Sequence, residues 1–578
     1  MSRCRRPVTR QVDGPVRRDD RASRHRRWGV DARAVGEDRT VTPSLPSPPT
    51  IPGLLERAVR EFGERTYVVT PTGRLTYDEA NRRSARIARQ LLRRGVGKGT
   101  RVGLFFTNGD DWIAWWLAAS RIGALVVPLS TMYTPAEIAK VLRLSDVGTL
   151  VSPRRVLGVD AQSRLEAALP ELSAQPDARL ALCAAPYLRS IVVVGAADAR
   201  WATGWDEGDE GVSEEVLAAA EAEVSPADVA VMVHTSGSTA DPKGVVHTHG
   251  TLVRQTSTWP TAIRAVTGTE GPGRILCAMP FFWIGGLLAV TGALHEPVTL
   301  LVLPRLDAGA ALDLAERERA TGIVGWPAFT QRLRDHPTFA SRDLTSAPTL
   351  REGPLDIAMT NVPDGFPVHR TMSETAGGFA FTDIAIVDED GEPTPDGVIG
   401  ELLIRGVGVM AGYNKRERAD TFDDDGWYHT GDRVYRHEGD PRLFYVGRTT
   451  ELIKSAGANV SPLEVEAVVG EFAGVAQCVV VGVQDEARGE EVCAVVVPSS
   501  AEVDLTALAE HAREQLSAYK VPTLWAVVTT DQIPTLPSGK FDRRTLRGLV
   551  VDGAVPSHRT SNLDGAVRPE APRGASSG

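Results

Sequence analysis

The chain has 578 residues, of which 42% are hydrophobic and 24% are charged. That length exceeds what one hydrophobic core usually supports, so at least two domains are expected. No run approaches eighteen apolar residues, which argues against a membrane-spanning helix. The five cysteines are scattered without CxxC spacing, which argues against a disulfide framework or a structural zinc site and favours a reducing compartment such as the cytoplasm.

The formal net charge is -10, but it is distributed unevenly. The first forty residues hold twelve arginines and six acidic residues, about +6 in total, which leaves about -16 for the remainder. Basic arms are typical of nucleic-acid-binding segments and of targeting peptides. This arm lacks an apolar core, and its acidic residues do not fit a transit peptide. We therefore expect a disordered leader over residues 1–44, with no nucleic-acid partner.

The first regular element is a helix expected at residues 54–62, after a Pro/Ser-rich stretch. Apolar strand-like runs then alternate with helical segments. An apolar helix is expected at residues 112–122, and strands are expected at residues 101–106, 124–129, 190–194, 229–234, 274–278, 298–302, 321–324 and 384–387. This alternation predicts an α/β architecture with layered sheets.

The C-terminal part has a different pattern. It predicts helices at residues 462–470 and 505–516 and strands at residues 475–483, 491–497 and 525–528, which together make a compact α+β unit. We therefore expect four parts: the leader, a large domain over residues 45–446, a small and mobile domain over residues 447–550, and a polar disordered tail over residues 551–578.

The strongest local motif is Thr-Ser-Gly-Ser-Thr-Ala-Asp-Pro-Lys-Gly at residues 235–244, directly after an apolar strand. Hydroxyl groups and glycine backbone N–H groups in such a loop can donate hydrogen bonds to phosphate oxygens, and Lys243 adds a positive charge. The spacing is not that of a Walker A loop. The motif therefore predicts a phosphate site of another kind.

Together with three later segments, this loop resembles the adenylate-forming (ANL) superfamily, which includes acyl-CoA synthetases, peptide-synthetase adenylation domains and firefly luciferase. The later segments are Gly-Trp-Tyr-His-Thr-Gly-Asp at residues 426–432, a hinge-like string at residues 447–466, and Pro-Thr-Leu-Pro-Ser-Gly-Lys at residues 534–540. They occur in the family's order and cover roughly residues 50–549.

The resemblance implies a role for each matching residue. Asp432 is expected to accept hydrogen bonds from the ribose hydroxyls, and Arg448 to donate to the ribose. Lys540 is expected to be catalytic, bridging the α-phosphate and the attacking carboxylate. Thr450 occupies the hinge position. The expected ATP or AMP contacts are Thr235, Ser236, Gly237, Ser238, Thr239, Lys243, Gly353, Arg370, Ser373, Asp432 and Arg448.

Residues 369–377, His-Arg-Thr-Met-Ser-Glu-Thr-Ala-Gly, look like the family's metal-binding segment. Glu374 is therefore the candidate Mg²⁺ ligand and a second catalytic candidate, because a hard carboxylate oxygen suits that ion. The competing string at residues 358–361 has no carboxylate. Arg370 replaces the tyrosine that stacks on adenine in relatives, and a guanidinium plane can also stack on a purine. The stretch from Glu374 to the next strand is shorter than in the family.

Pro-Phe-Phe-Trp-Ile-Gly-Gly at residues 280–286 resembles an acyl-CoA synthetase subgroup that has tryptophan where many relatives have histidine. Trp283, Gly285, Gly286 and Trp326 are the candidate acyl-pocket residues. The alternative is that both tryptophans simply fill the core, as large aromatic side chains often do.

The resemblance implies a ligase that uses ATP and Mg²⁺ to convert a carboxylic acid into an acyl-adenylate, and then transfers the acyl group to a thiol. CoA is the expected thiol, and a separate carrier protein is the alternative acceptor. Two other functions stay open. One is activation of another oxyanion, such as nitrite for diazotisation of an arylamine, and the other is a non-catalytic nucleotide-binding role.

Overall fold

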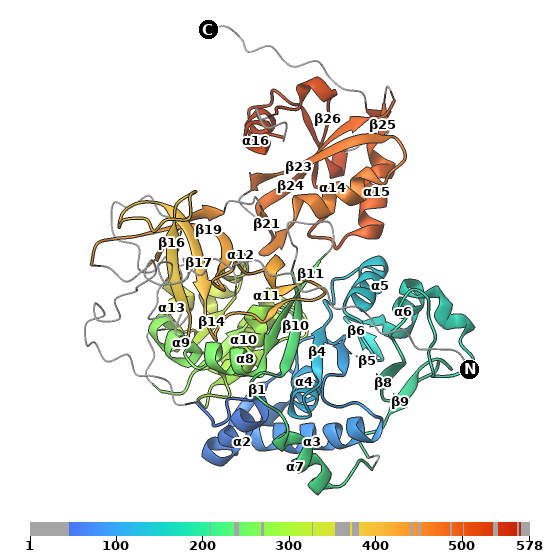
Figure 1. Ribbon diagram of the computed structural model, residues 1–578, viewed down its shortest axis with the longest axis vertical. Helices are drawn as coiled ribbons and strands as arrows, with labels where there is room; N and C mark the ends of the chain where they lie inside the picture. The colour runs from blue at the N-terminus through green and yellow to red at the C-terminus, as the bar shows by residue number, and fades with distance from the viewer. Residues whose placement is uncertain are drawn as a thin grey trace, which may run out of the picture. The chain divides into compact units, whose positions relative to one another are not determined.

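The computed structural model describes residues 45–208, 210–235, 242–267, 271–325, 327–352, 370–372, 381–439, 443–448, 452–485, 488–500, 502–535, 541–562 and 566–567 (Figure 1). They all belong to one compact unit, Ser44–Gly578. Among them, none of the helices combines the length and the hydropathy that crossing a bilayer requires.

The largest sheet has eight strands. Six neighbouring strands run parallel, from β10 to β9, whereas β11 and β18 add an antiparallel edge. Their order is β18 (Gly412–Tyr413), β11 (Lys243–Thr248), β10 (Val229–Thr235), β4 (Leu125–Pro128), β3 (Arg101–Leu104), β5 (Thr149–Pro153), β8 (Ser190–Val194) and β9 (Thr203–Trp205). A parallel sheet of this kind is normally covered on both faces.

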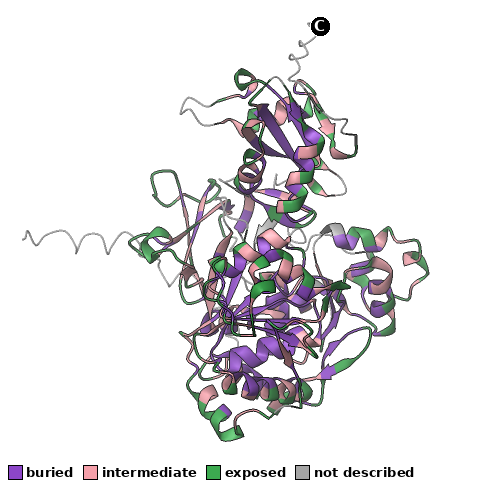
Figure 2. Ribbon diagram, turned by 90° about the vertical axis from the view of Figure 1, so that its right-hand side faces the viewer, coloured by how far each residue is buried: buried purple, intermediate pink, exposed green. Residues whose placement is uncertain are grey.

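Both faces of this sheet are indeed buried. In β4, Val126 packs into one hydrophobic cluster, whereas its neighbours Leu125 and Val127 pack into another on the opposite face, as the alternation of side chains along a strand requires. On the first face, helix α4 (Asp110–Arg121) contributes the fully buried Trp112 and Trp116, stacked with ring centroids 6.0 Å apart. Figure 2 shows the buried residues concentrated along the central strands.

A second, five-stranded sheet lies on the other side of this helical layer. Its strand β12 supplies Ile275 and Cys277 to the same cluster as Val126 and Trp112, and Leu276 to a third cluster on its outer face. The order is β14 (Gly322–Val324), β12 (Arg274–Cys277), β13 (Thr299–Val302), β1 (Thr66–Val69) and β2 (Arg74–Thr76). The layers predicted from the sequence are therefore present.

Helices cover these sheets and connect their strands. Many begin at a Ser, Thr or Asp cap; the side chain of Thr134, for example, accepts from the backbone N–H of Glu137 at the start of α5. Those of the large domain besides α4 are α2 (Ile51–Phe62), α3 (Tyr77–Arg93), α5 (Pro135–Leu144), α6 (Ala161–Ala168), α7 (Glu214–Ala222), α8 (His249–Thr256), α9 (Trp259–Thr267), α10 (Ile284–Gly292), α11 (Ala308–Arg317), α12 (Pro327–Arg334) and α13 (Pro348–Glu352).

A third sheet is antiparallel and carries the predicted ribose-binding segment. Its order is β15 (Arg370–Met372), β20 (Leu443–Arg448), β19 (Tyr428–Arg436), β17 (Gly400–Arg405) and β16 (Asp383–Val387). The short elements of the large domain are the β6–β7 hairpin (Arg155–Val156 and Val159–Asp160) and the 3₁₀ helices η1 (Pro170–Ala174), η2 (Phe339–Ser341) and η4 (Arg418–Asp420).

The small C-terminal domain is built on a separate sheet with its own core. Val480 of β23 packs against α14 and α15 on one face, whereas Val479 and Val481 face α16 on the other. Its elements are β21 (Ile453–Ser455), β22 (Ala458–Val460), α14 (Pro462–Gly470), β23 (Val475–Asp485), β24 (Gly489–Pro498), β25 (Val503–Asp504), α15 (Leu505–Gln515), β26 (Leu524–Val527), η5 (Thr530–Gln532) and α16 (Arg543–Val551). The predicted α+β unit is therefore present.

The sequence prediction was wrong about part of the tail. Residues from 551 onward were expected to be disordered, but β27 (Ser557–Arg559) pairs with β26, η6 (Thr560–Asn562) follows it, and β28 (Ala566–Val567) pairs with β25. The side chain of Thr560 also accepts a hydrogen bond from the Trp525 indole at 2.9 Å. The polar composition of this segment did not reveal the strands, which are held by backbone pairing to the domain, with Val555 adding one buried side chain to its core.

Removing the leader should leave a functional protein. Residues 1–44 lie outside the described residues. The first described helix, α2, begins at Ile51, and its N-terminus is capped by Thr50. A chain that starts at Val41 is expected to match the full chain in melting temperature and turnover. A large fall in either quantity would show that the leader is structural.

Three buried histidines predict loss of stability in acid. Burial lowers the pKa of His234 and of His249 to about 4 and that of His295 to about 3. The hydrogen bonds of His295 require its neutral form, because its Nδ1 accepts from Arg57 at 3.3 Å. Since the folded pKa is below the unfolded value, the unfolded chain binds more protons, and stability falls as pH drops from about 6.5 toward 4.

At pH 5 each of these histidines should cost about 2 kcal/mol relative to pH 8, and three together approach the whole stability of a typical domain. Urea unfolding measured between pH 8 and pH 5 tests this expectation. His295→Gln keeps an acceptor beside Arg57 and should make the pH dependence shallower. A free energy of unfolding that stays flat over this range would contradict the prediction.

Candidate active site

Strands β10 and β11 hold the two ends of the predicted phosphate loop. They are antiparallel neighbours, with Thr235 opposite Lys243 and His234 opposite Gly244. A Cβ atom at Gly244 would lie 2.7 Å from Sδ of Met232, so glycine permits the close packing at this point. The predicted contacts between the two strands, Ser236, Gly237, Ser238 and Thr239, lie outside the described residues.

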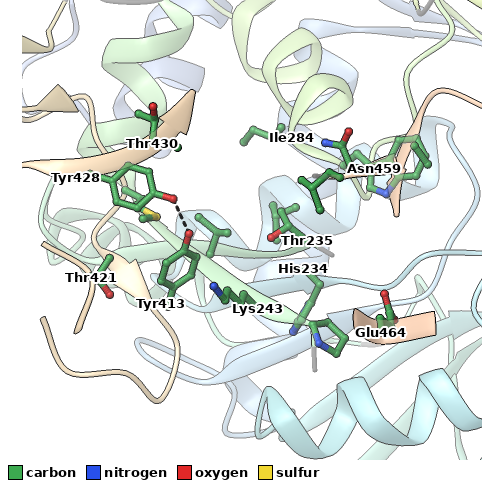
Figure 3. A pocket seen from close by; sticks show the side chains of 18 of the residues that line it. His234, Thr235, Lys243, Ile284, Tyr413, Thr421, Tyr428, Thr430, Asn459 and Glu464 are labelled. Atoms are coloured by element: carbon green, nitrogen blue, oxygen red, sulfur yellow. Dashed lines mark hydrogen bonds between the residues drawn. The ribbon is translucent and has the colours of Figure 1, made fainter. Parts of the chain in front are cut away.

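A cavity of about 990 Å³ opens at this end of the sheet. Thr235 and Lys243 line it together with the start of α10, the turn before β19, and residues of the C-terminal domain. Figure 3 shows Tyr413 and Tyr428 on one side and Asn459 and Glu464 on the other, with Lys243 and Thr235 between them. Parts of the chain that are remote in sequence therefore meet around one cavity.

Lys243 supplies a positive charge to this cavity. Burial lowers the pKa of its ammonium group, and the nearby Arg416 adds to the effect. Its Nζ lies 5.3 Å from the ring centroid of Tyr413, within the range of a cation–π contact. An anionic ligand would offset the repulsion between the two cations, as expected beside a phosphate loop.

The predicted ribose-binding residues are neighbours in the third sheet. Asp432 in β19 lies opposite Arg448 in β20 in the strand register, which brings the Cα atoms of a directly opposed pair within about 5.5 Å. Arg370 in β15 belongs to the next strand of the same sheet. Gly431, adjacent to Asp432, lines the cavity. The sheet thus places Asp432 beside Arg448, whereas Arg370 lies opposite Tyr445, three residues from Arg448 along β20.

The predicted acyl-pocket residues divide into two groups. Trp283 and Gly285 line the cavity at the start of α10, and the Trp283 ring stands edge-on to that of Tyr519, with centroids 6.4 Å apart. Gly286 was assigned to the pocket as well, but it is buried, and a Cβ atom there would lie 2.2 Å from the Pro280 carbonyl oxygen. The glycine is needed because the helix start packs on this backbone, which the motif alone did not reveal.

If the cavity takes the acyl group that the sequence predicts, truncation of Trp283 should change which acids are activated. A tryptophan that lines the cavity predicts that Trp283→Ala favours larger acids over smaller ones. A purely structural tryptophan predicts a loss of roughly 3–5 kcal/mol of stability and an equal fall for every acid. Specificity constants for a graded acid series, with thermal unfolding alongside, distinguish the two.

The fully buried Trp112 offers a matched control. Trp112→Ala should lower the melting temperature without reordering the acids. If Trp283→Ala behaves in the same way, the assignment of Trp283 to the pocket is wrong. Trp326, its predicted companion, lies outside the described residues.

Sequence reasoning missed a buried ionic cluster at the cavity wall. Lys520 donates to Glu137 of α5 at 2.8 Å and to Glu464 of α14 at 2.7 Å. Lys520 and Glu464 both line the cavity. It also missed a tyrosine pair, in which the hydroxyls of Tyr413 and Tyr428 are 2.7 Å apart. None of these residues belongs to a recognisable motif in the sequence around it, so the sequence did not indicate that they would meet.

The principal catalytic candidate, Lys540, is among the predicted residues that lie outside the described ones. The base of its loop is described: Thr535 and Phe541 form an isolated β-bridge, and the backbone N–H of Asp542 donates to the Pro534 carbonyl at 2.8 Å. Besides those already noted, the other predictions outside the described residues are Gly353, Ser373, Glu374 and Thr450. Their assignments stay predictions.

Two family models match the chain. The model described as AMP-binding enzyme matches residues 55–355, and the model described as AMP-binding enzyme C-terminal domain matches residues 464–540. The first contains both strands that flank the phosphate loop and the Trp283 segment. The second ends at Lys540.

Curated proteins match over most of their length. The chain is 32% identical over 502 residues to feruloyl-CoA synthase from Amycolatopsis sp, covering 82% of this chain and 93% of that protein. It is 30% identical over 536 residues to the 3-[(3aS,4S,7aS)-7a-methyl-1,5-dioxo-octahydro-1H-inden-4-yl]propanoyl:CoA ligase of Mycobacterium tuberculosis (strain ATCC 25618 / H37Rv), covering 86% of this chain and 99% of that protein.

Among solved structures, the amide bond synthetase McbA from Marinactinospora thermotolerans superposes with a TM-score of 0.65 at 25% identity, covering 86% of this chain and 99% of the other. The o-succinylbenzoate CoA synthetase of Bacillus subtilis shares the fold, with a TM-score of 0.63 at 22% identity.

Proposed function

Because the chain belongs to the AMP-binding enzyme family, we propose that its main cavity activates a carboxylic acid with ATP and passes the acyl group to a thiol. The carboxylate attacks the α-phosphate and pyrophosphate leaves. The thiol then attacks the acyl carbon of the adenylate, and AMP departs. The observation that carries the proposal is the meeting, around one cavity, of the phosphate-loop ends and residues next to Asp432.

The residues divide the work as follows. Lys243 and the phosphate loop attract the phosphates, Asp432 and Arg448 hold the ribose, and Lys540 neutralises the charge that develops as the carboxylate attacks. Mg²⁺, for which Glu374 is the proposed ligand, would offset charge on the phosphate oxygens when bound. The four described cysteines are free thiols, and we place the enzyme in the reducing cytoplasm on that basis.

CoA is the proposed thiol. Feruloyl-CoA synthase and the propanoyl:CoA ligase are both named for CoA thioesters. McbA is named for amide bond synthesis. An amine is therefore the alternative acyl acceptor that an assay should compare with CoA.

Pyrophosphate release tests the first half of the proposal. The full chain with MgATP should release pyrophosphate with a subset of a panel of aromatic, alicyclic and straight-chain acids, and CoA should then give a thioester visible by mass spectrometry. Release with nitrite plus an arylamine, and with none of the acids, would replace the proposal by the diazotisation alternative. No release with any substrate would indicate a non-catalytic protein.

A further inference from the structure

A second cavity adjoins the main one. It has a volume of about 320 Å³ and shares walls with the main cavity at Val245, Ile284, Met410 and Tyr428. Strand β11, helices α8 and α10 and the turn before β18 surround it. The two cavities are therefore immediate neighbours, and we call the smaller one the side cavity.

The side cavity is mostly apolar, and most of its polar groups are already satisfied within the protein. Gln255 donates to the Gly408 carbonyl at 2.8 Å, and Thr251 donates to the Val409 carbonyl at 3.3 Å. The Tyr428 hydroxyl pairs with that of Tyr413. These contacts hold the turn against α8 and leave the aliphatic side chains to form the walls.

His247 is the exception. Its Nδ1 atom is buried and has no hydrogen-bond partner among the described residues, although its side chain lines the side cavity and is only partly buried. An unpaired buried polar atom is costly and uncommon. Because Nδ1 itself has almost no exposed surface, a ligand in the side cavity reaches it only after the imidazole ring turns, and would then remove this cost.

The position of His247 in β11 relates it to the reaction centre. Side chains alternate along a strand, so Lys243, Val245 and His247 project from the same face. Lys243 lies at the phosphate-loop end and lines the main cavity, Val245 lines both cavities, and His247 lines the side cavity. Four residues at about 3.3 Å each separate Lys243 from His247 by about 13 Å.

We propose that His247 determines specificity by binding an uncharged oxygen, a hydroxyl or carbonyl, at the end of the acid remote from its carboxylate. This inference rests on the proposed function. The carboxylate lies by the phosphate loop, the apolar body passes Val245 and Ile284, and the remote oxygen reaches the imidazole. The substrate class is therefore an apolar acid with a distal hydroxyl or oxo group.

The charge state of His247 agrees with an uncharged partner. Burial lowers the pKa of its imidazole to about 4, so the ring is neutral at pH 7. A neutral imidazole has one donor and one acceptor nitrogen, which suits a hydroxyl or a carbonyl. A charged distal group would enter an apolar cavity without a counter-ion, at a large desolvation cost.

Matched acids that differ only in the distal oxygen test the inference. Suitable pairs are 3-phenylpropanoate with 3-(4-hydroxyphenyl)propanoate, and octanoate with 8-hydroxyoctanoate, assayed by pyrophosphate release. The wild type should prefer the oxygenated member of a pair, and His247→Leu should reduce that preference about tenfold. His247→Gln keeps a donor and an acceptor and should retain much of the preference.

Leu288, which lines the same cavity, provides the control. Leu288→Ala enlarges the cavity and should change the rates of both members of a pair alike, leaving their ratio unchanged. The melting temperature of His247→Leu should not fall, because the substitution removes an unpaired polar group.

The outcomes separate the two proposals. If acids are used but the oxygen brings no advantage, or if His247→Leu leaves the ratio unchanged, the role of His247 is wrong while the function stands. If the protein uses only the unsubstituted acids, the role of His247 is likewise wrong and the proposed function still stands. If no acid supports pyrophosphate release, the function fails, and the inference that rests on it fails too.

Discussion

Lys540→Ala is expected to abolish acyl-adenylate formation while leaving transfer from preformed acyl-adenylate largely intact. Loss of a preorganised cation at the reacting phosphate should cost roughly 3–4 kcal/mol or more, a fall of at least about 10²–10³ in that step. The described base of the loop is held by the Thr535–Phe541 bridge and by the Asp542–Pro534 hydrogen bond, so removing the side chain should not disturb the domain.

The two half-reactions are measured separately. ATP–pyrophosphate exchange reports the first, and AMP release from synthetic acyl-adenylate plus CoA reports the second. Arg544→Ala is the matched control, because Arg544 is an exposed cation on α16 four residues away. Equal loss of both half-reactions in Lys540→Ala would show that the lysine is not specific to adenylation.

The sequence predicts individual elements well where one pattern persists over several residues. The apolar run at residues 229–234 became β10, and the tryptophan-rich segment at residues 112–122 became α4 within two residues at its N-terminal end. Periodicity suffices in such cases because burial on one or both faces determines the element.

The sequence could not predict pairings between very short strands or ion pairs between distant residues. The strand β18 has two residues and is defined by its pairing with β11, which is remote in the chain. No periodicity exists over two residues. Gly286 showed a related limit, because a glycine that lines a pocket and a glycine packed within the first turn of a helix look alike in a motif. Only the structure shows that the Pro280 carbonyl occupies the space a side chain would need.

An ionic cluster that no sequence pattern predicted is formed by Glu137, Lys520 and Glu464. This cluster connects the large domain to the small one. Their side chains are 8%, 5% and 7% exposed. Glu137 also accepts from the Ser517 hydroxyl at 2.6 Å. Burial alone would lower the pKa of the Lys520 ammonium, but Tyr519 and the two carboxylates outweigh it and hold that pKa above its usual value.

Lys520→Met is therefore expected to lower the free energy of unfolding by about 3–5 kcal/mol, because it leaves two buried carboxylates without their cation. Chemical unfolding followed by tryptophan fluorescence measures the loss. Arg60→Met is the matched control, since Arg60 pairs with Glu56 on the surface, where both side chains are more than half exposed. Such a pair contributes little.

The pH dependence identifies the cause of the loss. Burial already raises the pKa of the Glu464 carboxyl, which Lys520 only partly offsets. Without Lys520 that pKa should rise further, so the folded variant binds protons more tightly than the unfolded chain does. Protonation then restores stability as pH falls through the raised pKa. The gap between wild type and Lys520→Met should narrow from pH 8 to pH 5, whereas a gap that stays constant would assign the loss to packing rather than to charge.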